Sequence, residues 1–104
     1  MIDQARIEAL IEEATVDCYD EHEEYWGMLA ALQMELRFPF PAFAMGEPVA
    51  VVGIDEGHSN ERRGIMVVIQ KDGDDYSFPL SELQVRGENE HNIAWIAAYR
   101  YWSR

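Results

Sequence analysis

The spacing of apolar residues changes abruptly at the segment Phe38-Pro39-Phe40-Pro41. Before it, over residues 3–36, apolar side chains recur at intervals of three and four, the period of an amphipathic α-helix. After it, short β-branched runs are typical of strands. Because neither proline can continue a helix, the chain divides here into a helical part and a β-rich part.

The helical part has one weak point. At Thr15-Val16-Asp17, β-branched and Asx side chains compete with the helix. Asp20 followed by Glu23 has the spacing of a capping box, which starts helices. We therefore expect either one bent helix or two helices joined near residues 16–20. The apolar stripe consists of Ile7, Ile11, Ala14, Cys18, His22, Tyr25, Leu29, Leu32 and Leu36.

The β-rich part reads as short strands with tight turns. Asp-Gly within Lys71-Asp72-Gly73-Asp74 predicts a hairpin, because these residues accept positive φ angles. The polar segment 55–63 is expected to be an exposed loop. The remaining expected elements are strands at 49–54, 64–70 and 76–78, a single turn at 80–83, a short strand at 84–85, and a C-terminal helix at 93–102 capped by Asn92.

This pattern predicts an α+β fold in a single domain, residues 1–104. Its parts are an N-terminal helix or helix pair (1–37), a small antiparallel β-barrel (38–87) and a short C-terminal helix (88–104). Seven aromatic residues are expected to form the core, with an aromatic peptide-binding groove as the alternative. They are Tyr19, Tyr25, Trp26, Trp95, Tyr99, Tyr101 and Trp102.

The net charge restricts the class of partner. Twenty acidic residues face eight basic ones, a formal charge of −12. Nucleic acids and anionic membrane surfaces are disfavoured, because phosphate binding draws on Lys and Arg. No apolar run is long enough to span a bilayer, and the start lacks the features of a signal peptide, so we expect a cytoplasmic protein. One cysteine, Cys18, excludes an internal disulfide and a multi-thiolate zinc site.

The charge is concentrated near the N-terminus. Residues 1–24 contain nine acids and one base, and residues 7–36 contain neither Lys nor Arg. An ordinary solvated helix face mixes signs, because like charges one turn apart are destabilising. Calcium takes six to eight oxygen ligands, many of them carboxylates. The acidic segment 17–24 therefore predicts a cation site, with a solvated helix face as the alternative. Its candidate ligands are Asp17, Asp20, Glu21, Glu23 and Glu24.

Other groups give weaker signals. The spacing of an EF-hand loop is absent. Asp55-Glu56-Gly57 and Asp72-Gly73-Asp74-Asp75 are possible second cation sites or simply solvated turns.

Two further groupings bear on transition-metal binding and on catalysis. Cys18 and His22 would stand one turn apart on a continuous helix, a geometry for a transition metal or for a buried pair. His58 near Asp55 has no nucleophile elbow around it. With no catalytic motif present, we expect a protein that is not an enzyme.

Three segments together resemble a known family. Val16–Glu23, followed by Gly27 and by Leu36–Phe40, is similar to the opening signature of the CcbP-type bacterial calcium-binding proteins. Gly46–Gly53 resembles their first long strand, and Phe78–Leu83 with the terminal Ala-Tyr-Arg-Tyr-Trp completes the match. The resemblance implies Ca²⁺ binding without an EF-hand, on a helical segment packed against a small SH3-like barrel.

The resemblance also implies which acids matter. Those at matching positions are Asp17, Asp20 and Glu23, while Glu21 falls where the family often has an acid and Glu24 matches less well. The loop after Gly53, with Asp55, Glu56 and Glu61, lies where the family also has an acidic stretch, so the resemblance implies a possible second metal site there. The resulting hypothesis is a calcium buffer or sensor. The alternative is an acidic module that docks on a basic protein partner independently of calcium.

Overall fold

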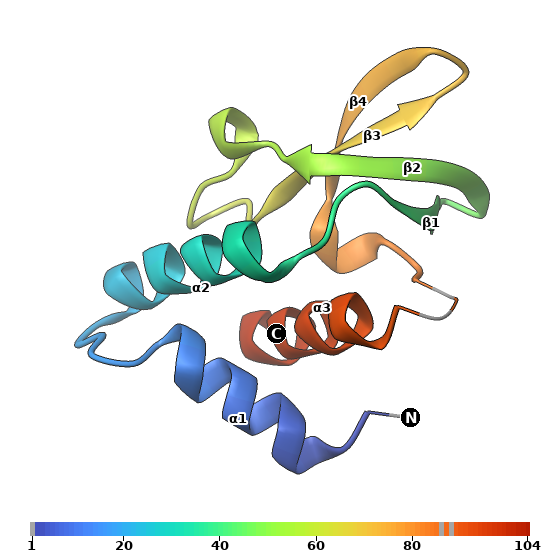
Figure 1. Ribbon diagram of the computed structural model, residues 1–104. Coiled ribbons are helices and arrows are strands. Elements are labelled where there is room, and N and C mark those ends of the chain that lie inside the picture. The colour runs from blue at the N-terminus through green and yellow to red at the C-terminus, as the bar shows by residue number, and fades with distance from the viewer. Residues whose placement is uncertain (1, 86, 88) are drawn as a thin grey trace. The chain divides into compact units, whose positions relative to one another are not determined.

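The structure is a computed structural model that describes residues 2–85, 87 and 89–104 (Figure 1). The chain forms two compact units, one made of the residues up to Leu36 together with Glu90–Arg104, the other of Arg37–Asn89. Within the described residues, three α-helices belong to the first unit, and four strands and two short 3₁₀ helices to the second. The predicted α+β class is confirmed.

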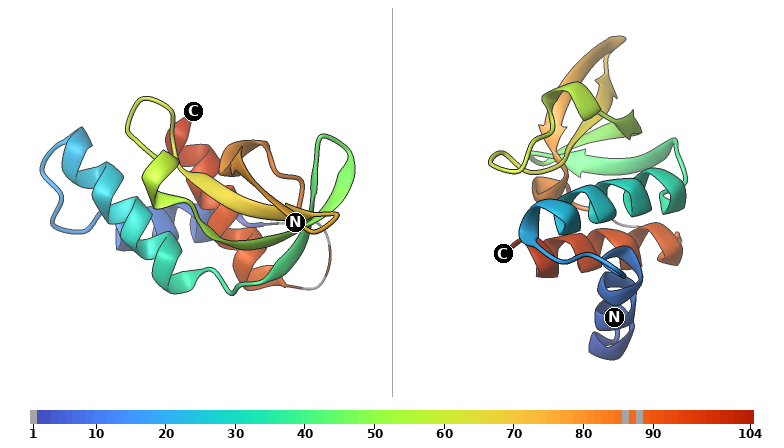
Figure 2. Two further views of the ribbon diagram at one scale, coloured as in Figure 1. Left: turned by 90° about the horizontal axis from the view of Figure 1, so that it is seen from above. Right: turned by 90° about the vertical axis from the view of Figure 1, so that its left-hand side faces the viewer.

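The helical unit contains α1 (Gln4–Ala14), α2 (Glu21–Glu35) and α3 (Glu90–Ser103). The N-terminal stretch is thus a helix pair, and the break between the helices lies in the segment 15–20, where the sequence favours a helix least. Both views in Figure 2 show α3 running alongside α2 within this unit, and α3 also packs against α1. None of the helices in the described part of the chain is long and apolar enough to cross a membrane.

The core of the helical unit comes from the predicted stripe and from α3. Tyr25, Leu29 and Leu32 on α2 are buried, as are Trp95 and Tyr99 on α3. The aromatic prediction is therefore confirmed for three of the seven residues.

Several residues predicted for the interior lie outside it. Tyr19 is 88% exposed and Trp26 is 50% exposed, so neither belongs to the core. His22 is also exposed and Cys18 is only half-buried, which corrects the continuous stripe. The reason is the helix break, because residues before and after it no longer share one helical register.

The start of α3 also differs from the prediction. The helix begins at Glu90, so Asn92 lies inside the first turn and is fully buried instead of serving as the cap. A capping residue would sit before the helix, with its side chain on the free N–H groups.

The sheet unit contains β1 (Phe40–Ala44), β2 (Glu47–Ile54), β3 (Met66–Lys71) and β4 (Asp74–Pro79). The strands follow the order β1-β2-β3-β4, and each is antiparallel to its neighbours. A bulge interrupts β2 between Val51 and Gly53. Strand β1 was not predicted, because Phe-Pro-Phe-Pro indicated only the end of the helical part. As an outer strand of this sheet, β1 can accommodate a proline.

The turns follow the sequence closely. Asp72 (φ 52°) and Gly73 (φ 83°) form the predicted hairpin turn, and Leu80–Glu82 is the predicted single turn, a 3₁₀ helix. The expected strand at 84–85 is reduced to one bridge, between Gln84 and Phe43. The sheet of four described strands is open, so closure into the predicted barrel is not observed.

Candidate functional site

The acidic segment begins where α1 ends. Both the backbone N–H and the hydroxyl of Thr15 donate to Ile11 O, at 2.9 and 2.7 Å, which completes the last turn. Asp17 then adopts φ 61°, the left-handed conformation that Asp and Asn tolerate better than most residues. The chain therefore turns out of the helix axis at the first of the predicted ligands.

The start of α2 confirms the predicted cap. The Asp20 carboxylate accepts a hydrogen bond from Glu23 N at 2.8 Å. The Glu23 carboxylate accepts from Tyr19 N at 2.7 Å, one residue earlier than in a standard capping box. Two of the predicted ligands thus each use one carboxylate oxygen to hold the helix start. Glu21, Glu23 and Glu24 also lie in the first turn, where negative charge complements the helix dipole.

Glu24 has a partner that the sequence did not reveal. Its side chain is half-buried, and Oε1 accepts a hydrogen bond from the Trp102 indole Nε1 at 3.3 Å. This contact joins the first turn of α2 to the last turn of α3. Seventy-eight residues separate the two, so no local pattern could have indicated it.

The four remaining predicted ligands are exposed: Asp17, Asp20, Glu21 and Glu23. Three of these acids, Asp17, Asp20 and Glu23, act together with Glu24 on Cys18. Burial raises the pKa of the Cys18 thiol, and the negative charges of Glu23, Glu24, Asp17 and Asp20 raise it further. The Cys18 Sγ also lies 3.4 Å from Glu23 O. One sulfur atom therefore lies within the combined field of four carboxylates.

Cys18 and His22 do not have the geometry that a continuous helix would give them. Cys18 precedes α2 and lies in the break, whereas His22 is in the first turn of α2. The two residues are therefore not one helical turn apart. The one-turn spacing was wrong because it required a continuous helix.

The donor chemistry of the acidic segment suits calcium, since all of its acidic groups are hard oxygen ligands. However, the described residues contain no group of three or more His, Cys, Asp or Glu side chains arranged to hold a metal ion. The carboxylates gather in one region without forming a finished coordination shell.

The second predicted cluster is organised by hydrogen bonds around Asp55. This residue precedes the 3₁₀ helix Glu56–His58, and its carboxylate lies 2.8 Å from the His58 Nδ1 and 3.3 Å from the His58 backbone N. Burial by itself would raise the pKa of Asp55, but hydrogen bonds from His58 and Ser77 hold it below its usual value. Glu56 and Glu61 are exposed.

The neighbouring hydroxyl has a structural role. Ser59 Oγ donates to Asp55 O at 2.7 Å and accepts from Met66 N at 2.8 Å. Ser59 thus joins the turn that contains Asp55 and His58 to the start of β3.

Comparison with known proteins gives the family. The family model for CcbP proteins, described as calcium binding, matches residues 6–103. The chain belongs to the CcbP family. The resemblance stated from the three sequence segments is confirmed, and Ca²⁺ is the ligand of this CcbP-family protein.

Solved structures show the same fold. The crystal structure of Anabaena CcbP has a TM-score of 0.75 with 24% identity, covering 98% of this chain and 91% of that chain. A calcium-binding protein in its calcium-binding form has a TM-score of 0.73 with 23% identity, covering 96% of this chain and 90% of that chain. A comparison with curated proteins gives no match.

Proposed function

We propose that this CcbP-family protein binds calcium through the acidic segment and acts as a non-enzymatic buffer or sensor. The ligands are Asp17, Asp20 and Glu23, assisted by Glu21 or Glu24. The observation that carries the proposal is the start of α2, where the Asp20 carboxylate accepts the Glu23 N–H at 2.8 Å and the Glu23 carboxylate accepts the Tyr19 N–H at 2.7 Å, so that two acidic side chains are held within one turn of each other. Like charges held close together repel each other, and a divalent cation relieves that repulsion.

The hydrogen bonds of the acidic segment are compatible with this role. Asp20 accepts the Glu23 N–H through Oδ1, and Glu23 accepts the Tyr19 N–H through Oε2. Each carboxylate has a second oxygen that a metal ion can use. The cap then fixes the position of two ligands and leaves one oxygen of each carboxylate for the metal ion.

The experiment exploits two backbone features. Asn tolerates the left-handed conformation of Asp17 and caps helices as well as Asp does. The double variant Asp17→Asn with Asp20→Asn therefore removes two charges while retaining the local fold. The matched control is Glu8→Gln with Glu12→Gln, two exposed acids of α1 outside the segment.

Calcium titration by calorimetry is the primary measurement, supported by terbium emission sensitised by Tyr19, Tyr25 and Trp26. We expect the Asn double variant to weaken binding at least tenfold, and the Gln control to bind as the wild type does. Binding no tighter than about 1 mM in the wild type, or unchanged binding in the Asn double variant, would refute the proposed site.

A second calcium site at Asp55, Glu56 and Glu61 remains part of the proposal. Calcium there would have to compete with His58 for the Asp55 carboxylate. Asp55→Asn should reduce the calorimetric stoichiometry by one ion if this site exists. An unchanged stoichiometry would remove the second site and leave the first intact.

The finer features of the fold and setting are proposals as well. We propose that the sheet curls into a partly open SH3-like barrel, supported by the bridge between Gln84 and Phe43 beside β1. We also propose that residues 1–104 act as a single domain of a bacterial cytoplasmic protein. A single cooperative unfolding transition, coincident by far-UV circular dichroism and tryptophan fluorescence, is the expected result for one domain.

A further inference from the structure

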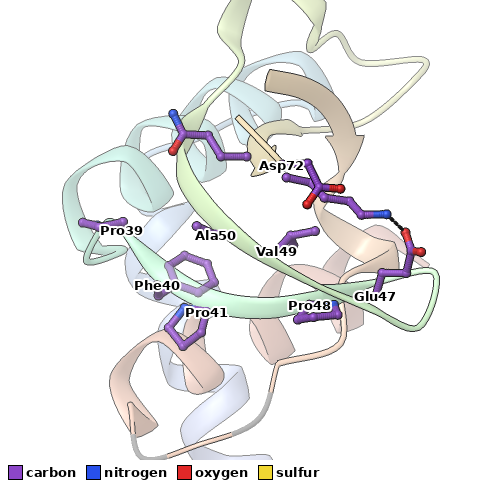
Figure 3. A pocket seen from close by; sticks show the side chains of 10 residues that line it. Pro39, Phe40, Pro41, Glu47, Pro48, Val49, Ala50 and Asp72 are labelled. Carbon is purple, nitrogen blue, oxygen red and sulfur yellow. Dashed lines mark hydrogen bonds and ion pairs between the residues drawn. The ribbon is translucent and has the colours of Figure 1, made fainter. Parts of the chain in front are cut away.

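A groove lies on the sheet unit where β1, β2 and the end of β3 meet (Figure 3). Its volume is about 570 Å³, within the range in which proteins bind ligands or side chains. Six of its ten lining residues are apolar: Pro39, Phe40, Pro41, Pro48, Val49 and Ala50.

The strand register explains the apolar floor. Pro41, Ala50 and Gln70 are directly opposite one another on three adjacent strands, so their side chains share one face. Ala50 is the smallest of the three and forms the low point between its neighbours. Pro41 and Pro48 are exposed and, as prolines, have no N–H to offer a ligand. The groove therefore presents flat apolar rings to solvent.

The rim carries an excess of negative charge. Lys71 is the only basic residue among those lining the groove, and it forms an ion pair with Glu47, drawn as a dashed line in Figure 3. Asp72 lies at the hairpin turn, and Asp75 stands opposite Gln70 in the register of β3 and β4. With Lys71 engaged by Glu47, two charges remain to attract a cation: that of Asp72, which lines the groove, and that of Asp75, which lies beside the groove on the neighbouring strand.

We propose that this groove binds an extended basic segment of a partner protein that carries an aromatic residue. The aromatic ring lies on the floor around Ala50, between the exposed prolines, and flanking Lys or Arg side chains pair with Asp72 and Asp75. Aromatic anchors in apolar pockets, surrounded by complementary charge at the rim, are the common basis of such recognition. This interaction uses none of the proposed calcium ligands, so it goes beyond calcium binding and does not depend on it.

The test uses a capped synthetic peptide, KRWRK, as the probe, added to ¹⁵N-labelled protein and followed by NMR. Two control peptides separate the contributions: KRARK lacks the aromatic ring, and EEWEE reverses the charge. We expect saturable shifts confined to residues 39–50 and 70–75, at peptide concentrations below about 5 mM. Neither control peptide should produce them.

Two variants of the protein test the two parts of the surface. Ala50→Gln fills the floor and should weaken KRWRK binding at least fivefold. Asp72→Asn keeps a residue suited to the positive φ angle and should weaken it by about threefold, the effect of one exposed charge pair. Glu82→Gln, an exposed acid of the same unit that does not line the groove, should leave binding unchanged. Each variant must first reproduce the wild-type melting temperature and amide dispersion.

Several results would overturn the proposal. These are equal binding of KRARK, shifts that map to residues 17–24, no saturation by KRWRK, or an Ala50→Gln variant that binds normally. Shifts at the groove that grow with protein concentration alone would identify a second copy of the chain as the occupant instead. Because calcium binding by Ala50→Gln should equal that of the wild type, failure of the groove and failure of the calcium site are distinguishable.

Discussion

Replacing Gly27 with alanine places helix propensity and tertiary packing in opposition. Gly27 lies in α2, where alanine would normally stabilise a helix by about 0.5–1 kcal/mol. However, a Cβ at this position would lie 2.5 Å from Ala14 O and 3.1 Å from the Cys18 Sγ. The nearest atom belongs to the backbone at the end of α1, which cannot rotate away as a side chain can.

The packing cost decides whether Gly27→Ala stabilises or destabilises the protein. Overpacking a filled site costs about 1–3 kcal/mol, and a contact with the backbone belongs at the upper end of that range. After subtracting the gain in propensity, we expect a net loss of about 1–2 kcal/mol. For a domain of this size, each kcal/mol lowers the melting temperature by about 4–8 °C, so the expected fall is roughly 5–15 °C.

Thermal unfolding followed by circular dichroism measures this fall. Ala30→Gly provides the matched control, because Ala30 is exposed in the same helix and reports the propensity effect alone, a loss of about 1 kcal/mol. A Gly27→Ala variant as stable as the wild type, or more stable, would show that α1 and α2 do not approach each other closely at this position. The reactivity of Cys18 toward a thiol reagent should also change in Gly27→Ala and not in Ala30→Gly.

Three further predictions concern the acidic segment and the Asp55 loop. Asp20→Ala should lower the free energy of unfolding by about 1 kcal/mol, measured by chemical denaturation, because the helix cap is lost. Asp20→Asn keeps a capping side chain and should be nearly neutral. Equal losses in the two variants would mean that the charge of Asp20, and not its capping hydrogen bond, stabilises the protein. Glu23→Gln should lower the pKa of Cys18, seen as a thiol that reacts faster at pH 8, while Glu8→Gln should leave the rate unchanged. Because the pKa of Asp55 is held below its usual value, its contribution to stability is present above the unfolded-state pKa and is lost as the pH falls through the folded-state pKa. His58→Gln should raise the Asp55 pKa in a carboxyl NMR titration, and an unchanged value would contradict the role assigned to His58.

Local signals in the sequence anticipated most of the secondary structure. The Asp20–Glu23 spacing located the start of α2, and Asp72-Gly73 located the hairpin, because capping and turn conformations depend on a few adjacent residues. The same local signals failed at β1, where two prolines concealed a strand whose pairing with β2 is set by distant residues.

In the candidate site, too, local features could be predicted from the sequence and long-range contacts could not. The acidic residues and their concentration in one segment were visible in the sequence, and so was the family resemblance. The helix break was anticipated, but its consequence for Cys18 and His22 was not, because a helical wheel assumes a single continuous axis. The contact between Trp102 and Glu24 had no sequence signal at all.

The sequence by itself determined the division at Phe38–Pro41, the charge of the first 24 residues and the family to which the chain belongs. These properties depend on residue types and on spacings within one or two turns. Tertiary structure alone decided that Gly27 must lack a side chain against Ala14, that Trp102 holds Glu24, and that three strands place Pro41, Ala50 and Gln70 on one face. Such contacts join residues distant along the chain, and their positions follow from how whole elements pack, which no local pattern encodes.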